Sequence, residues 1–164
     1  MTVSAAVPMV PDSGMLAPDF TLPAMLGATK SNVDLRALRG RVIVIAFYPG
    51  DKTTGCTAEL GKFRDEFSQL FGEGVSVLPI SADNMTSHAA WSDEMHFPFA
   101  LLSDTSQTVA SLYGSTIPGR AYDNRTVFVV GRDGRILYRN LKFGALSEMA
   151  YRDLAAAVAR AKAS

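Results

Sequence analysis

Cysteine is nearly absent from this 164-residue chain, which contains a single one, Cys56. One cysteine excludes a disulfide within the chain and fits a reducing compartment, so we expect the protein to be cytoplasmic. Together with only two histidines, His88 and His96, it makes a poor set of metal ligands. We therefore expect no metal and no other cofactor.

Long apolar runs and an excess of one charge are lacking as well. No run approaches the ~20 residues that cross a bilayer. The first residues carry no positive charge and no sustained apolar segment, so we expect neither a membrane span nor a secretory signal. Sixteen basic and sixteen acidic residues give a formal net charge of zero, which argues against nucleic acid or an acidic membrane as a partner.

What the chain does have fits one ordinary domain. Hydrophobic residues make up 48% of it, and a chain of this length buries roughly 70% of the surface that its unfolded form exposes. Residues 1–15 are rich in Pro, Ser and Met, and we predict that they form a loose arm. Residues 16–164 are then a single domain.

Apolar residues follow the strand period in some segments and the helix period in others. Residues 42–47 are almost wholly apolar and predict a strand buried on both faces. From Cys56 to Phe71, apolar residues recur every three or four positions and predict an amphipathic helix of about four turns. We also predict an extended piece at 17–22 followed by a polar turn, strands at 75–80, 99–102, 126–130 and 135–139, and helices at 84–94, 106–112 and 148–161.

The order of these elements predicts the fold class. Early alternation of strands and helices implies parallel strands with crossover helices, and the late hairpin adds an antiparallel edge. The result is an α/β protein with a mixed central sheet flanked by helices. A cysteine at a strand-to-helix junction of such a sheet is the thioredoxin-like plan.

The position of Cys56 favours a reactive thiol. The predicted strand at 42–47 leads through a turn into a helix that begins at or just before this residue. Unpaired backbone N–H groups and the helix dipole favour an anion in the first turn of a helix. The placement can therefore make the thiol a nucleophile.

The pattern Pro49-x-x-x-Thr53-x-x-Cys56 resembles the active-site signature of the peroxiredoxins. The resemblance covers about residues 15–160, and its further matches are Phe47-Tyr48-Pro49, Cys56-Thr57-x-Glu59, Ala17-Pro18-Asp19-Phe20 and the run from Arg125 to Gly134. The Cys-Thr-x-Glu flank is most similar to the bacterioferritin-comigratory branch and its alkyl-hydroperoxide-reductase-E-like relatives. Many members of that branch carry a second cysteine five residues after the first, where this chain has Gly61. The chain thus resembles a single-cysteine peroxiredoxin.

This resemblance implies an antioxidant thiol-dependent peroxidase with a redox-active Cys56. Its thiolate attacks the O–O bond of hydrogen peroxide or an organic hydroperoxide and becomes a sulfenic acid. Lowering a thiol pKa from about 8.5 to about 6 raises the thiolate fraction about thirty-fold at pH 7 but weakens the nucleophile about ten-fold. A fast peroxidase must therefore also stabilise the charge that grows on the departing oxygen.

The resemblance implies how the other matching residues meet this requirement. Thr53 places its hydroxyl between sulfur and peroxide, and Arg125 holds the thiolate and a peroxide oxygen. Backbone N–H groups around Gly55 and Cys56 complete a set of donors that are typically worth ~3–4 kcal/mol each. Pro49 covers the sulfur and leaves no unpaired N–H there. We expect Glu59 to orient neighbouring side chains.

Each of these residues also has a plainer interpretation. Thr53 can be only a helix cap, Pro49 can merely shape the turn, Arg125 can lie on the surface and Glu59 on a solvated helix face. We interpret His88 and His96 as solvent or core histidines, and Trp91 as a packing residue that can also line the peroxide pocket.

Without a second cysteine, the sulfenic acid needs an external thiol. The candidates are a low-molecular-weight thiol, a glutaredoxin- or mycoredoxin-like protein, and thioredoxin. The resemblance also implies a homodimer. Two other functions stay open: a thioredoxin-like thiol transferase or disulfide reductase, although the chain lacks Cys-x-x-Cys, and a catalytically inactive binding module or chaperone.

Overall fold

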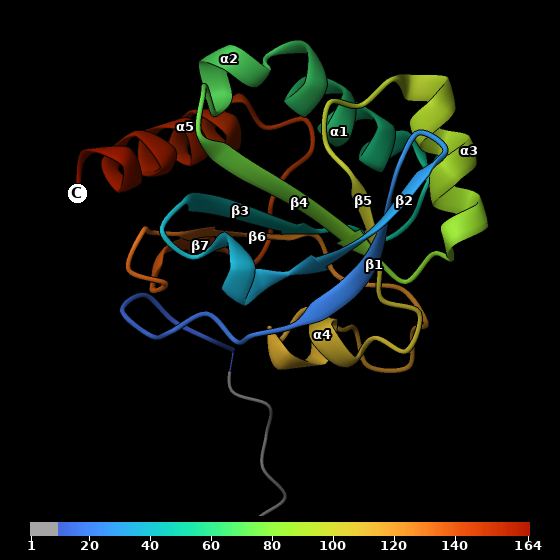
Figure 1. Ribbon diagram of the computed structural model, residues 1–164, viewed down its shortest axis with the longest axis horizontal. Coiled ribbons are helices and arrows are strands. Elements are labelled where there is room, and N and C mark those ends of the chain that lie inside the picture. Colours follow the sequence, from blue (N-terminus) through green and yellow to red (C-terminus); the bar gives the residue numbers. More distant parts are fainter. Residues whose placement is uncertain (1–9) are drawn as a thin grey trace, which may run out of the picture.

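The computed structural model describes residues 10–164, which form a seven-stranded sheet with helices on both faces (Figure 1). The strands are β1 (Thr21–Leu26), β2 (Thr29–Asp34), β3 (Val42–Phe47), β4 (Val75–Ser81), β5 (Leu101–Ser103), β6 (Thr126–Val130) and β7 (Ile136–Asn140). The helices are the 3-10 helix η1 (Leu35–Leu38), α1 (Thr54–Asp65), α2 (Phe67–Leu70), α3 (Met85–Met95), α4 (Thr108–Leu112) and α5 (Glu148–Ala163).

The sheet is mixed, as predicted. Its strand order is β2-β1-β5-β4-β3-β6-β7. β3, β4 and β5 run parallel, with α1 and α3 as the crossover helices. β6 runs antiparallel to β3, and β7 pairs antiparallel with β6 at one edge. This is the thioredoxin-like arrangement that the sequence predicts.

The central strand β3 divides the core into two halves. All six of its residues are buried, and because side chains alternate across a strand they serve both faces. Val42, Val44 and Ala46 join a cluster with α1, α3 and α5. Ile43, Ile45 and Phe47 join the cluster on the face covered by α4. The apolar run that leads to the cysteine is therefore fixed from both sides.

The predicted four-turn helix from Cys56 is wrong in one respect, because it is broken into α1 and α2. The break falls at Glu66, whose φ of −113° and ψ of 28° lie outside helical values. It lets α2 lie on α5 and brings the Phe71 ring to 5.2 Å from the ring of Phe63, on the other side of the break. Packing of these aromatic rings outweighs the continuous helical pattern of the sequence.

The polar segment after residue 26 is a strand, where the sequence predicts a turn. β2 pairs antiparallel with β1 along its whole length. Its first four residues, 29–32, are exposed, and a polar edge strand of this kind discourages pairing between molecules. The predicted strand at 99–102 is also displaced, because β5 spans Leu101–Ser103.

The described part of the predicted loose arm is bound to β7. The Gly14 N–H donates to the Ile136 carbonyl at 2.8 Å, and the Ile136 N–H donates to Met15 at 2.9 Å. Arg139 donates to the carbonyls of Val10 and Pro11 and pairs with Asp12 at 3.3 Å. The arm prediction is therefore wrong for residues 10–15, while residues 1–9 lie outside the described part of the chain.

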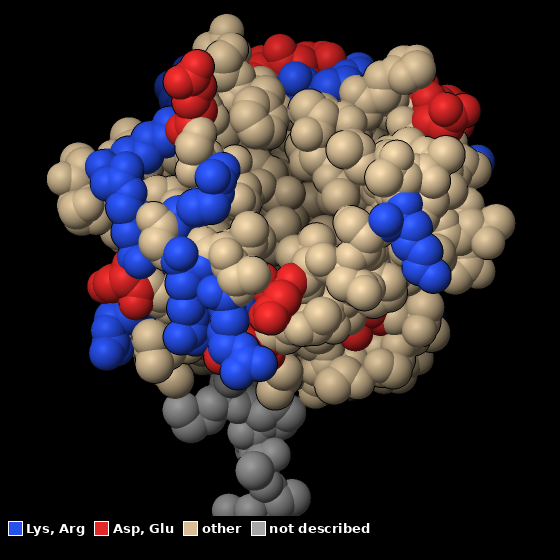
Figure 2. Space-filling view, viewed as in Figure 1, with Lys and Arg blue, Asp and Glu red and all other residues tan. Residues whose placement is uncertain are grey.

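The surface reflects the balanced charge of the sequence. Figure 2 shows acidic and basic side chains together toward the side where η1 and α5 lie, while much of the same face is uncharged. Among residues 10–164, we find no helix with the length and apolar character needed to cross a membrane.

Candidate active site

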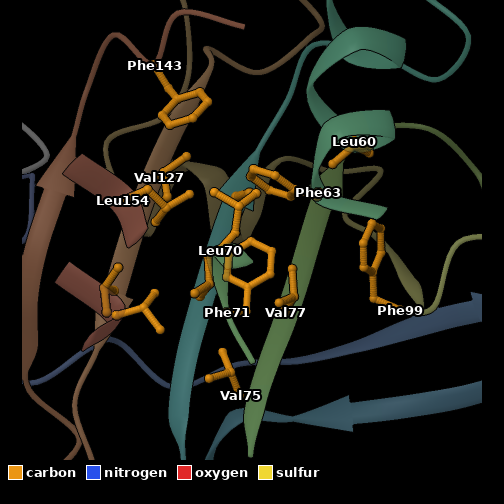
Figure 3. Close-up of a cluster of buried hydrophobic side chains, with 14 of the residues drawn as sticks. Leu60, Phe63, Leu70, Phe71, Val75, Val77, Phe99, Val127, Phe143 and Leu154 are labelled. Carbon is orange, nitrogen blue, oxygen red and sulfur yellow. The ribbon is translucent and has the colours of Figure 1, made fainter. Parts of the chain in front are cut away.

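Cys56 lies in the first turn of α1, directly after the turn that follows β3. The first hydrogen bond of the helix runs from the Thr57 N–H to the Thr53 carbonyl at 2.9 Å, so the amides of Gly55 and Cys56 precede the helical ladder. The thiol is fully buried and free of any disulfide. Further along the same helix, Leu60 and Phe63 point into the core (Figure 3), which holds the helix against the sheet.

Thr53 occupies the cap position of α1, but its hydroxyl does not cap the helix. It donates instead to the Gly50 carbonyl at 3.0 Å. The oxygen of that hydroxyl therefore keeps its lone pairs for another donor. The plain interpretation of Thr53 as a side-chain cap is wrong, and the first-turn amides receive no hydrogen bond from it.

Arg125 reaches the same place from the residue directly before β6. Its Nη1 donates to the Glu59 carboxylate at 2.6 Å, and its side chain is only 19% exposed. Burial by itself would lower the pKa of Arg125, but attraction to Glu59 and to Cys56 raises it. The guanidinium thus lies beside the thiol as a permanent cation.

Gly55 allows this close approach. A Cβ atom at residue 55 would stand 2.8 Å from Nη2 of Arg125, closer than real Cβ contacts. The guanidinium therefore lies against the bare backbone of the first helical turn, next to Cys56. This contact is a reason for glycine at this position that does not depend on turn formation.

Glu59 is buried, so its interpretation as a residue on a solvated helix face is wrong. The carboxyl is 0% exposed, and its Oε2 atom has no hydrogen-bond partner. Burial raises the pKa of Glu59 to about 7, although the charge and hydrogen bond of Arg125 act in the opposite direction. The pair therefore changes its charge close to neutral pH.

Pro49 lies half-buried in the turn between β3 and α1.

Figure 2 shows a hollow near the centre of one face, where a pocket is lined by Val33, Leu38, Phe67, Val77 and Phe99. Cys56 does not line it. The chemistry of the thiol is therefore separate from this hollow.

A buried polar network that the sequence did not predict lies beneath the same turn. Asp51, between Pro49 and Thr53, pairs with Nδ1 of His88 at 2.7 Å. It also accepts from the Tyr48 hydroxyl at 2.7 Å and from the Ser87 hydroxyl at 2.8 Å. Burial, followed by the charge of Asp51, raises the pKa of Tyr48, which keeps this hydroxyl a donor. No spacing in the sequence connects Asp51 with a histidine on another element.

The structure thus brings Cys56, Gly55, Glu59 and Arg125 into contact at the start of α1, with Thr53 at the cap position. His88 and Trp91 are core residues, as predicted. Within residues 10–164, no group of three or more His, Cys, Asp or Glu side chains is placed to hold a metal ion. The arrangement can stabilise a thiolate and, beside it, an oxygen that gains negative charge.

The chain is similar to known proteins in family, sequence and structure. Residues 13–139 match the AhpC/TSA family. The chain is 40% identical over 129 residues to "Putative peroxiredoxin bcp" of Coxiella burnetii, covering 75% of this chain and 83% of that protein. It is 36% identical to the chloroplastic peroxiredoxin Q of Suaeda salsa, covering 77% of this chain and 59% of that longer protein. The structure of the Xanthomonas campestris bacterioferritin comigratory protein matches with a TM-score of 0.76 at 28% identity, covering 92% of this chain and 99% of that one.

Proposed function

Because this chain belongs to the AhpC/TSA family and is a thiol-dependent peroxidase, we propose that Cys56 is the residue that attacks the peroxide. The observation that carries this proposal is the contact of the Arg125 guanidinium with the first turn of α1, beside the thiol. Cys56 is also the only cysteine in the sequence. No other residue can supply the thiolate.

In the proposed reaction, the Cys56 thiolate attacks one oxygen of the peroxide. An S–O bond forms, the O–O bond breaks, and the second oxygen leaves with the bonding electrons as hydroxide or alkoxide, which takes a proton to give water or an alcohol. The cysteine is oxidised to a sulfenic acid and the peroxide is reduced. Negative charge moves from sulfur to the departing oxygen in the transition state.

The donors at the start of α1 are arranged for this movement of charge. Arg125 is a permanent cation beside the sulfur, and the amides of Gly55 and Cys56 add the positive end of the helix. The Thr53 hydroxyl donates a hydrogen bond to the Gly50 carbonyl, and its oxygen can accept a hydrogen bond from the peroxide O–H. Pro49 shields the thiolate from water and has no N–H that would lack a partner there. Glu59 holds Arg125 in position.

The return step requires two thiol groups from outside the chain. The first condenses with the sulfenic acid to give a mixed disulfide and water, and the second releases Cys56 while the two external sulfurs form a disulfide. We propose a low-molecular-weight thiol, a glutaredoxin- or mycoredoxin-like protein, or thioredoxin as the source. Comparing turnover with each reductant at equal thiol concentration will identify it.

The proposed substrates are hydrogen peroxide and organic hydroperoxides. The structure of the Xanthomonas campestris relative is described in connection with alkyl peroxide reduction, which supports including alkyl hydroperoxides. Competition between hydrogen peroxide and an alkyl hydroperoxide for one equivalent of reduced protein gives the preference directly.

We also propose that the protein is a homodimer and that it acts in the cytoplasm. The resemblance to the peroxiredoxins supports the dimer. The location is supported by the need of Cys56 for an external reductant, because a reducing compartment provides one. Light scattering that gives the mass of one chain would overturn the first proposal. Cell fractionation tests the second.

The experiment that separates this function from thiol transfer measures two reactions of the same protein. Peroxide consumption with a dithiol donor should require Cys56 and disappear in Cys56→Ser. Reduction of a mixed disulfide in the absence of peroxide should stay at the uncatalysed rate. Full peroxide consumption by Cys56→Ser would reject the assignment of Cys56, while rapid disulfide reduction without peroxide would favour the thiol transferase.

A further inference from the structure

His88 connects three separate parts of the molecule beneath the active-site turn. It belongs to α3 and is 0% exposed. Its Nε2 atom lies 3.0 Å from the carbonyl oxygen of Leu102 in β5, and its Nδ1 atom lies 2.7 Å from Oδ2 of Asp51. A buried side chain with both polar atoms engaged fixes the elements that it joins.

Every polar atom of the pair has a partner. A carbonyl oxygen can only accept, so Nε2 of His88 donates to Leu102. Asp51 accepts from the hydroxyls of Tyr48 and Ser87. One further hydrogen bond joins its Oδ2 to Nδ1 of His88, so neither side chain can turn without losing buried hydrogen bonds.

Asp51 and Thr53 act on the same peptide unit. The N–H of Asp51 donates to Oδ2 of Asp83 at 2.8 Å, and the carbonyl on the other side of that planar unit, from Gly50, accepts from the Thr53 hydroxyl at 3.0 Å. Rotation of this peptide would turn the Gly50 carbonyl away from Thr53. Contacts that hold Asp51 in place therefore also hold the Gly50 carbonyl, and with it the direction of the Thr53 hydroxyl.

We propose that the buried Asp51–His88 pair is a positioning device for the peroxidase reaction, which holds the Gly50–Asp51 peptide so that Thr53 presents its oxygen to the peroxide. This inference rests on the proposed function. His88 and Asp51 touch no reacting atom. They act through the backbone on Thr53, and we expect their effect on rate to depend on its hydroxyl.

The test compares two reactions of Cys56 in the full-length protein, oxidation by hydrogen peroxide and alkylation by iodoacetamide. His88→Phe and Asp51→Asn should each slow oxidation about ten-fold or more, because small misplacements at a reacting centre have large effects. Alkylation, which does not use Thr53, should change less than about three-fold. His96→Asn is the matched control, since His96 is exposed at the end of the same helix in a left-handed conformation that asparagine tolerates.

A double-mutant cycle separates positioning from general loosening of the fold. If His88 acts through Thr53, the variant Thr53→Val/His88→Phe should oxidise no more than about three-fold slower than Thr53→Val alone. Independent, multiplying losses would overturn the inference. So would equal losses in oxidation and alkylation, which indicate a merely structural role.

A measurement on the unmodified protein covers variants that fail to fold. In NMR of the wild-type protein, the ring N–H of His88 should exchange slowly with water, as a buried hydrogen-bonded group does, and rapid exchange would overturn the buried pair and the inference with it. If the wild-type thiol does not react with peroxide, the proposed function fails and this inference fails with it. If the wild type reacts and both variants match it, only the positioning role is rejected.

Discussion

The guanidinium of Arg125 lies so close to Gly55 that a methyl group at residue 55 would be 2.8 Å from its Nη2 atom. Arg125 directly precedes β6 and Gly55 lies in the first turn of α1. The two come together because β6 pairs with β3, the strand that leads into α1. The contact places a permanent cation beside Cys56 without any intervening side chain. Any larger residue at this position would have to displace the guanidinium.

Gly55→Ala should therefore slow the enzyme. The displaced Arg125 should reduce the rate of Cys56 oxidation about ten- to hundred-fold. Alanine favours a helix by about 0.5–1 kcal/mol over glycine, but this gain should not appear in the stability, because the buried Glu59 loses its hydrogen bond from Arg125. Gly61→Ala is the matched control in the same helix, because its methyl group would meet only Met95 at 3.9 Å. Thermal unfolding and peroxide kinetics check both variants, and equal rates in the two would contradict the role of the contact.

Thr53→Val should slow oxidation by hydrogen peroxide about hundred-fold, because loss of one oriented polar group at a site of developing charge has effects of this size. Its effect on stability should be about 1 kcal/mol, since one hydrogen bond to the Gly50 carbonyl is lost. Thr53→Ser, which keeps the hydroxyl, should remain within about ten-fold of the wild type. Thr54→Val, at the exposed neighbouring position, serves as the control for a bulky change in this turn.

The Glu59–Arg125 pair should make the rate of reaction with peroxide depend on pH near neutrality. The pKa of Glu59 is raised to about 7, chiefly by burial, so the carboxyl is neutral at pH 6 and ionised at pH 8. A neutral carboxyl resembles glutamine, and Glu59→Gln should match the wild-type rate at pH 6 but fall behind at pH 8. Both rates depend on the ionisation of the Cys56 thiol, and this dependence drops out when one rate is divided by the other at each pH. A ratio that does not change with pH would show that the charge of Glu59 does not contribute.

Asp123 should make the protein less stable as the pH rises. Burial, together with the charges of Asp104 and Asp83, raises the pKa of Asp123 to about 7 against the opposing hydrogen bond from Gln107, and its Oδ2 atom has no partner. The folded state therefore binds a proton more tightly than the unfolded state, and stability falls between about pH 4 and pH 7 by about 1.4 kcal/mol per unit of pKa difference.

Asp123→Asn should remove this share of the pH dependence, since its amide oxygen can still accept from Gln107. Urea unfolding at pH 5 and pH 8 measures the difference in unfolding free energy, with the exposed Asp93→Asn as the control. The expected result is a smaller loss of stability between the two pH values in Asp123→Asn only. An unchanged difference would mean that Asp123 is ionised throughout.

The fold could be predicted where local pattern and tertiary packing agree. β3 and β6 are buried on both faces, so their apolar runs are unambiguous. The break at Glu66 and the polar strand β2 could not be predicted in the same way. The first depends on the packing of Phe71 against Phe63 across the break, and the second depends on backbone pairing with β1. Neither contact changes the local period of the sequence.

In the candidate site, too, local features could be predicted from the sequence and long-range contacts could not. Cys56 could be found from its place after an apolar strand, and the spacing of Thr53 and Glu59 from it is local. Arg125 came from the resemblance alone, since its contact with Glu59 spans 66 residues. The Asp51–His88 pair spans 37 residues and matches no motif. Such contacts are set by the order of strands in the sheet, in which β3 lies between β4 and β6.

The most direct test of the account is the mass of the intact reduced protein after one equivalent of hydrogen peroxide, with and without a reagent that traps sulfenic acid. The account predicts one trapped adduct per chain, located on Cys56, and none over the same interval in Arg125→Ala. A folded wild-type protein whose Cys56 remains an unmodified thiol would contradict the claim that this residue is the peroxide-reactive centre.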